Sequence, residues 1–147
     1  MRLGYEKALV ISCYLMNDRF MAFYDDGIYD NLTGALAPVY FYESAERLLS
    51  WAERSHQPVS LISLRLAPLD DDSLLRCARE IIRELRGGDL LSRMSEYTFA
   101  LLLLGDKIGA EQLIFRLRNT IGFPIDYQAT LVEVGEGVEA GLTRLAI

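Results

Sequence analysis

Apolar positions in the first half of the chain follow helical and strand periods in turn. Spacings of three and four residues predict an amphipathic helix over residues 38–54, and Pro38 suits its first turn. Residues 59–66 carry apolar side chains on both faces, which is typical of a strand covered on both sides. The helical spacing returns over residues 74–85, after an acidic segment at 70–73 that can cap a helix and place negative charge at its positive end.

The second half repeats this alternation. We predict a hairpin over residues 90–104, a helix over 107–119 and a half-exposed strand over 125–132, with Leu131 on its inner face. Residues 138–145 are expected to form a last short helix. One mainly antiparallel sheet of four or five strands, flanked by helices, is the simplest fold for this order and belongs to the α+β class.

Two interpretations are open for the N-terminal segment. Residues 5–24 suit a helix, but residues 8–16 are rich enough in Val, Ile and Tyr to form a strand. The apolar run is too short to span a bilayer, and Asn17, Asp18 and Arg19 follow it in place of a small-residue cleavage site. We therefore expect a helix or linker over residues 1–24 and one domain over residues 25–147.

Composition narrows the possible functions. A net charge of −6 offers no basic field for a nucleic-acid polymer, so binding to one is not expected. Cys13 and Cys77 lie far apart, and the single His56 completes no zinc-site spacing. Three consecutive carboxylates at residues 70–72 are interpreted as helix caps rather than as a metal site. We expect reduced, buried thiols in a cytoplasmic protein with no metal, no cofactor and no insertion into a membrane.

Residues 30–34, 86–89 and 99–103, taken in this order, resemble segments of the GGDEF (diguanylate cyclase) family, and the resemblance covers residues 25–145. Residues 30–34, Asp-Asn-Leu-Thr-Gly, resemble the Asp-x-Leu-Thr-Gly that opens these domains. Residues 86–89, Arg-Gly-Gly-Asp, resemble the Arg-x-x-Asp inhibitory site, which lies shortly before the family's Gly-Gly-Asp/Glu-Glu-Phe signature. An apolar strand then follows the signature position, as it does in the family. The resemblance implies a palm-like, ferredoxin-related sheet.

The signature itself is degenerate. Its place is taken by five residues of which only the last matches, namely Ser95, Glu96, Tyr97, Thr98 and Phe99. In the family, carboxylates hold metal ions that neutralise charge at the α-phosphate of GTP. Arg65 and Ala67 stand where the family has an Asp-x-Asp pattern, and a cation at position 65 would repel a divalent metal. The resemblance therefore implies that this chain is not an enzyme and has no catalytic residue.

The Arg-x-x-Asp motif, in contrast, is complete and implies binding of cyclic di-GMP. Arg86 would present a planar fork to guanine or phosphate, and Asp89 would accept from the guanine N–H edge. The expected ligand set joins the motif to nearby cations and consists of Arg86, Gly87, Gly88, Asp89, Arg93, Arg116 and Arg118. The alternative is structural, because a basic residue followed by Gly is also an ordinary helix end. In either case Arg86 and Asp89 are expected to close the preceding helix.

These observations leave three functions open. The leading one is a non-catalytic signalling module that binds cyclic di-GMP and relays its occupancy through a homodimer or another signalling protein. The second is a dimerisation or protein-interaction domain that binds no nucleotide. The third is an active cyclase, which the departures at positions 65, 67 and 95–98 disfavour.

Overall fold

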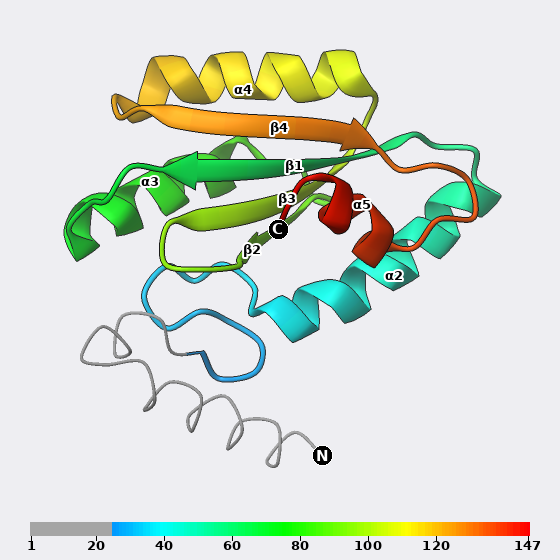
Figure 1. Cartoon of the computed structure of the whole chain (residues 1–147), viewed down its shortest axis with the longest axis horizontal. Helices are drawn as coiled ribbons and strands as arrows, with labels where there is room; N and C mark the ends of the chain where they lie inside the picture. Colours follow the sequence, from blue (N-terminus) through cyan, green and yellow to red (C-terminus); the bar gives the residue numbers. More distant parts are fainter. Residues whose placement is uncertain (1–24) are drawn as a thin grey trace.

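The structure is a computed structural model that describes residues 25–147, and the helix or linker predicted over residues 1–24 lies outside the described residues. Its elements run in the order α2 (Pro38–Arg54), β1 (Val59–Leu66), α3 (Asp71–Glu84), β2 (Leu90–Arg93), β3 (Thr98–Leu104), α4 (Lys107–Ile121), β4 (Ile125–Leu131) and α5 (Val138–Arg144) (Figure 1). Every element predicted between residues 38 and 145 is present, with ends that differ by a few residues. Within the described chain, no helix is long and apolar enough to cross a membrane.

The strands form one antiparallel sheet in the order β2-β3-β1-β4. β1 is central and pairs on both sides, with Leu61 opposite Leu102 of β3 and Thr130 of β4. Its central place explains why apolar residues fill both of its faces. β4 lies at an edge and alternates as predicted except at Leu131, which is 42% exposed rather than buried. The predicted α+β fold with a four-stranded antiparallel sheet is confirmed.

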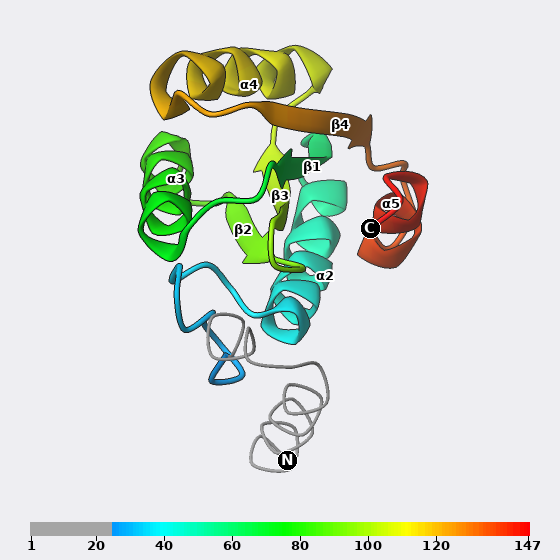
Figure 2. The same cartoon turned by 60° about the vertical axis from the view of Figure 1, so that its left-hand side comes forward.

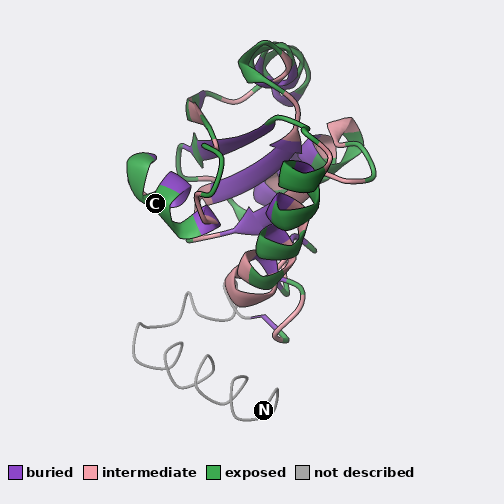
Figure 3. Cartoon of the chain, turned by 90° about the vertical axis from the view of Figure 1, so that its right-hand side faces the viewer, coloured by how far each residue is buried: buried purple, intermediate pink, exposed green. Residues whose placement is uncertain are grey.

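Helices cover both faces of this sheet, with α3 and α4 on one side and α2 and α5 on the other (Figure 2). The pleat divides β1 between the two layers, because successive side chains point to opposite faces. Ile62 and Leu64 join the core beneath α3 and α4, whereas Val59 and Leu61 join the core beneath α2 and α5. Figure 3 shows that the strands are largely buried while the outer turns of α2 are exposed.

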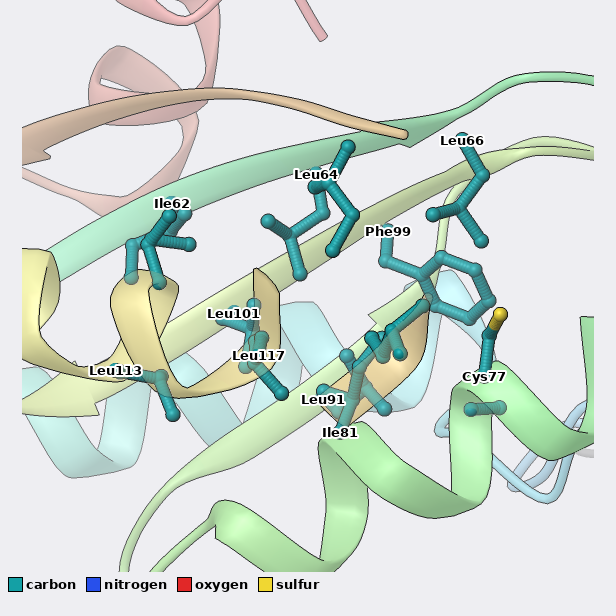
Figure 4. Packing of buried hydrophobic residues seen from close by; sticks show 14 of the residues in the cluster. Ile62, Leu64, Leu66, Cys77, Ile81, Leu91, Phe99, Leu101, Leu113 and Leu117 are labelled. Carbon is teal, nitrogen blue, oxygen red and sulfur yellow. The ribbon is translucent and has the colours of Figure 1, made fainter. Parts of the chain in front are cut away.

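The larger of the two cores lies between the sheet and the pair α3 and α4. Figure 4 shows its aliphatic side chains in contact with one aromatic ring and one thiol, contributed by Phe99 and Cys77. Cys77 is 2% exposed, and burial raises the pKa of its thiol. The expectation of a reduced, buried thiol is confirmed for Cys77, whereas Cys13 lies outside the described residues.

Side-chain caps fix the beginnings of α3 and α4. Asp70 accepts a hydrogen bond from the Ser73 N–H at 3.3 Å, and Asp106 accepts one from the Gly109 N–H at 3.0 Å. These bonds satisfy amide groups that have no partner inside the helix. Hydrogen bonds from the side chain and backbone of Ser73 also lower the pKa of the Asp70 carboxyl. The interpretation of Asp70 as a helix cap is confirmed.

Residues 30–34 form a turn that a buried ion pair joins to the β2–β3 hairpin. Asp30 accepts from the backbone N–H and the hydroxyl of Thr33, and Gly34 adopts a φ of +75°. Nη1 of Arg93 lies 3.2 Å from both carboxylate oxygens of Asp30, and the two side chains are 0% and 3% exposed. Arg93 also donates to the backbone carbonyl of Glu96 in the hairpin turn.

The two edges of the sheet are protected by different means. Beside β2, the backbone of Leu36 bonds to that strand and covers its outer side. On β4, the carbonyls of Ile125 and Leu131 accept hydrogen bonds from the side chains of Arg118 and Arg144. The β4 edge is therefore satisfied at its two ends by arginine side chains rather than by another backbone.

Candidate ligand site

The Arg-Gly-Gly-Asp segment forms a separate turn after α3, rather than part of the helix. α3 ends at Glu84, and Leu85 is already extended with φ −80° and ψ 147°. The expectation that Arg86 and Asp89 close the helix is therefore wrong. Neither Gly87 nor Gly88 has a positive φ, so the segment is not a helix end of the glycine C-cap type.

Asp89 holds this turn together and joins it to the sheet. Its Oδ2 accepts from the backbone N–H of Arg86 at 2.9 Å, and its own N–H donates to the Arg86 carbonyl at 3.0 Å. Its Oδ1 accepts from the backbone N–H of Leu104 at 2.9 Å, at the end of β3. The carboxylate is thus fixed by two backbone donors, and its position depends on the sheet as well as on the loop.

The two glycines of the turn have different surroundings. A Cβ at Gly88 would lie 2.6 Å from Cδ1 of Leu104, whereas a Cβ at Gly87 would meet nothing within 4 Å. Gly88 therefore allows the turn to approach the end of β3 closely, and Gly87 faces open space.

Arg86 and Asp89 line one hollow of about 300 Å³ between the turn, the end of β3 and the first turns of α4. Its charged and amide side chains are Glu84, Arg86, Asp89, Asp106, Gln112 and Arg116. The structure thus brings Arg86, Asp89 and Arg116 of the expected ligand set together.

The charged side chains around this hollow differ in whether they already have a partner in the protein. Nε of Arg116 donates to Oε2 of Glu84 at 2.9 Å, and Asp106 is engaged as the cap of α4. The guanidinium of Arg86 is exposed and has no ion pair or hydrogen bond within residues 25–147. Arg86 is therefore the cation most available to an anionic ligand.

Two arginines of the expected ligand set lie elsewhere. Arg93 is fully buried with Asp30, so no ligand in the hollow can reach its guanidinium. Arg118 donates to the carbonyl of Ile125 at 3.1 Å and stacks over the ring of Tyr127 at 5.0 Å from its centroid. The structure therefore does not bring Arg93 and Arg118 to the hollow of Arg86, because distance along the chain does not fix on which side of the sheet a side chain lies.

Residues 95–99 lie at the turn and in the second strand of the β2–β3 hairpin, apart from the hollow. The Tyr97 carbonyl accepts from the Leu66 N–H at 2.9 Å, and the Tyr97 hydroxyl contacts the Leu69 carbonyl at 3.3 Å. Phe99 is fully buried in the core. Arg65 lies opposite Thr98 on the neighbouring strand, and its guanidinium donates to the carbonyl of Ala146.

Across residues 25–147, no group of three His, Cys, Asp or Glu side chains is arranged to hold a metal ion. Arg65 places a positive charge beside the hairpin turn.

Sequence reasoning missed several features of the hollow. Gln112 and Asp106 line it but belong to no motif, and the pairing of Glu84 with Arg116 depends on the packing of α3 against α4. The sequence does carry one sign of the Asp30–Arg93 pair. Asp30 belongs to a turn motif, and a carboxylate that is buried in such a turn requires a cationic or donor-rich partner.

The sequence matches no protein-family model and no curated protein. Among solved structures, the fold is similar to a microbial GGDEF domain studied with cyclic di-GMP, with a TM-score of 0.70, 19% identity, and coverage of 81% of this chain and 85% of that one. It is also similar to the GGDEF domain of DgcB from Caulobacter crescentus in complex with c-di-GMP, with a TM-score of 0.71, 16% identity, and coverage of 83% and 87%.

A third similar structure is the diguanylate cyclase SiaD from Pseudomonas aeruginosa in complex with its activator SiaC. Here the TM-score is 0.72 and the identity 22%, with 99% of this chain and 66% of that chain covered. At such identities the likeness concerns the fold, and it agrees with the antiparallel sheet and two helical layers described above. The chain therefore has a GGDEF-like fold.

Proposed function

We propose that this chain is a non-catalytic GGDEF-like module that binds cyclic di-GMP through Arg86 and Asp89. The observation that carries the proposal is that both side chains line one hollow, in which the Arg86 guanidinium has no partner among the described residues. Arg116 lines the same hollow and supplies a second cation for a ligand with two phosphates.

The hydrogen bonds of Asp89 are compatible with ligand binding. Each carboxylate oxygen accepts one backbone N–H, and an ionised carboxylate offers about four acceptor sites in total. Capacity is left for the N–H edge of a guanine. Because the backbone already fixes the carboxylate, little side-chain entropy would be lost when ligand binds.

The proposed loss of catalysis rests on the positions that would hold metal. Arg65 and Ala67 replace the acids of the family's Asp-x-Asp pattern, and Tyr97 and Thr98 replace the acidic part of the signature. A cationic side chain at position 65 opposes the binding of a divalent ion that phosphoryl chemistry needs. Incubation with GTP and magnesium should yield no cyclic dinucleotide, and its formation would contradict this part of the proposal.

Calorimetry with cyclic di-GMP tests the binding site directly. The wild type should bind, and Arg86→Ala should weaken binding by about 10- to 150-fold, the range expected when hydrogen bonds to a charged group are lost. Arg83→Ala is the matched control, because Arg83 is an exposed cation of α3 that pairs with Glu80 and does not line the hollow. The absence of heat from the wild type at tens of micromolar protein would refute the proposal.

The alternative function is a nucleotide-independent interaction module. One observation favours it: Ile108 and Phe115 of α4 are 64% and 68% exposed, which is unusual for large apolar side chains. Relay to a protein partner has a parallel in the complex of SiaD with SiaC. Analytical ultracentrifugation separates the two functions, since a dimer that forms equally with and without cyclic di-GMP would support the alternative.

A further inference from the structure

Helix α4 presents an apolar surface beside the proposed ligand site. Ile108 and Phe115 lie seven residues apart and therefore on one side of the helix. They line a shallow hollow of about 380 Å³, together with Glu111, Gln112 and Arg116. We call this surface the α4 shelf.

The α4 shelf and the Arg86 hollow are neighbours. Gln112 and Arg116 line both of them, so the two hollows meet across these side chains. One side of this boundary carries the exposed Arg86 and the half-buried Asp89, and the other carries the exposed side chain of Phe115. A ligand that extends past Arg116 reaches the ring.

The volume of the Arg86 hollow indicates that a bound cyclic dinucleotide extends beyond it. The Arg86 hollow measures about 300 Å³, which is the lower limit of pockets that hold small ligands. A cyclic dinucleotide contains two purines and two phosphates, and only one purine edge can face Asp89. The second purine must lie outside the first hollow, and the α4 shelf is the apolar surface adjoining it.

We propose that Phe115 is a stacking platform for a guanine base of the dinucleotide held by Arg86 and Asp89. This inference rests on the proposed function and adds the residue that would bind the second base. Exposed aromatic rings are the usual supports for unpaired bases, because every base has a π face. The guanidinium of Arg116 next to the ring adds a planar cation that can lie against phosphate or purine.

The test compares cyclic di-GMP affinities of four proteins by calorimetry. Phe115→Ala should weaken binding by about 5- to 150-fold, the range for the loss of one base–aromatic stack. Phe115→Leu should also weaken it, because a leucine keeps the apolar cover but lacks the ring. Trp51→Ala is the control, since Trp51 is 44% exposed on α2, on the other side of the sheet, and should bind as the wild type does.

A spectroscopic readout tests contact with the ring itself. In a Trp51→Phe background, Phe115→Trp carries a tryptophan at the proposed platform and no other tryptophan. Cyclic di-GMP should quench its fluorescence with the same affinity that calorimetry gives. Wild-type affinity in Phe115→Ala, or unchanged fluorescence while the ligand binds, would overturn the inference.

The outcomes separate this inference from the function on which it rests. If Arg86→Ala loses binding and Phe115→Ala does not, the platform is refuted and the proposed function stands. If the wild type does not bind, both fail. If Phe115→Ala converts a ligand-free dimer to a monomer and leaves affinity unchanged, a second copy of the chain covers the shelf and the inference is overturned.

Discussion

Removal of Asp30 should destabilise the domain far more than removal of any exposed charge. The carboxylate of Asp30 is 3% exposed and its partner Arg93 is 0% exposed, so Asp30→Ala leaves a guanidinium charge buried without its counterion. Breaking a buried pair in this way costs about 3–5 kcal/mol. Thr33 loses two hydrogen bonds in the same variant, which adds to the cost.

This cost is a large part of the stability of a domain. Small domains unfold with a free energy of about 5–15 kcal/mol, so Asp30→Ala would consume between a fifth and all of it. For a urea m-value of about 2 kcal/mol/M, the midpoint should fall by about 1.5–2.5 M. Urea denaturation followed by circular dichroism measures both quantities, and an unchanged m-value would show that the denatured state is the same.

Two further variants make this prediction specific to the ion pair. Arg93→Met alone should also be strongly destabilising. The double variant with Asp30→Ala should lose less free energy of unfolding than the two single variants lose together, by at least about 2 kcal/mol. Arg83→Ala breaks an exposed pair with Glu80 and should cost less than about 1 kcal/mol. A loss below about 1 kcal/mol in Asp30→Ala, or strict additivity in the double variant, would refute the reasoning.

Two other changes follow from the contacts described above. Glu84→Gln frees Arg116 from its ion pair and removes a negative charge from the hollow. The affinity for a dianionic nucleotide, measured by calorimetry, should therefore rise by up to about 5-fold. An unchanged or lower affinity would contradict this. Gly141→Ala should destabilise the domain in thermal unfolding, because the new Cβ would lie 2.5 Å from Cδ1 of Leu61. In Gly109→Ala the nearest atom to the new Cβ would be 3.7 Å away, so this change should stabilise α4 by about 0.5–1 kcal/mol. Equal effects of the two glycine changes would count against the packing argument.

The sequence predicted the elements well because their patterns are local. The double-faced apolar run of β1 and the acidic cap at Asp70 were interpreted correctly, since each depends on residues close in the chain. Leu131 was assigned to the inner face but is 42% exposed, because alternation along one strand does not fix the burial of its last residue.

The site was predicted only in part, for a related reason. Arg86 and Asp89 belong to one short motif, and the structure places them in one hollow. Arg116 of the following helix lines the same hollow, whereas Arg93 and Arg118 do not, and their positions in the chain did not distinguish the three arginines. The β2–β3 hairpin turns Arg93 into the core toward Asp30, and that direction follows from strand register rather than from spacing.

The two edges of the sheet, at β2 and at β4, are protected by different means, and this difference has a consequence for self-association. Strand addition beside β2 is blocked by the chain's own backbone at Leu36, whereas within residues 25–147 the ends of the β4 edge are covered by the side chains of Arg118 and Arg144. Loss of Arg118 and Arg144 would leave the carbonyls of Ile125 and Leu131 without these donors. Any strand added to this sheet is therefore expected at β4, where the two arginines oppose it as gatekeepers.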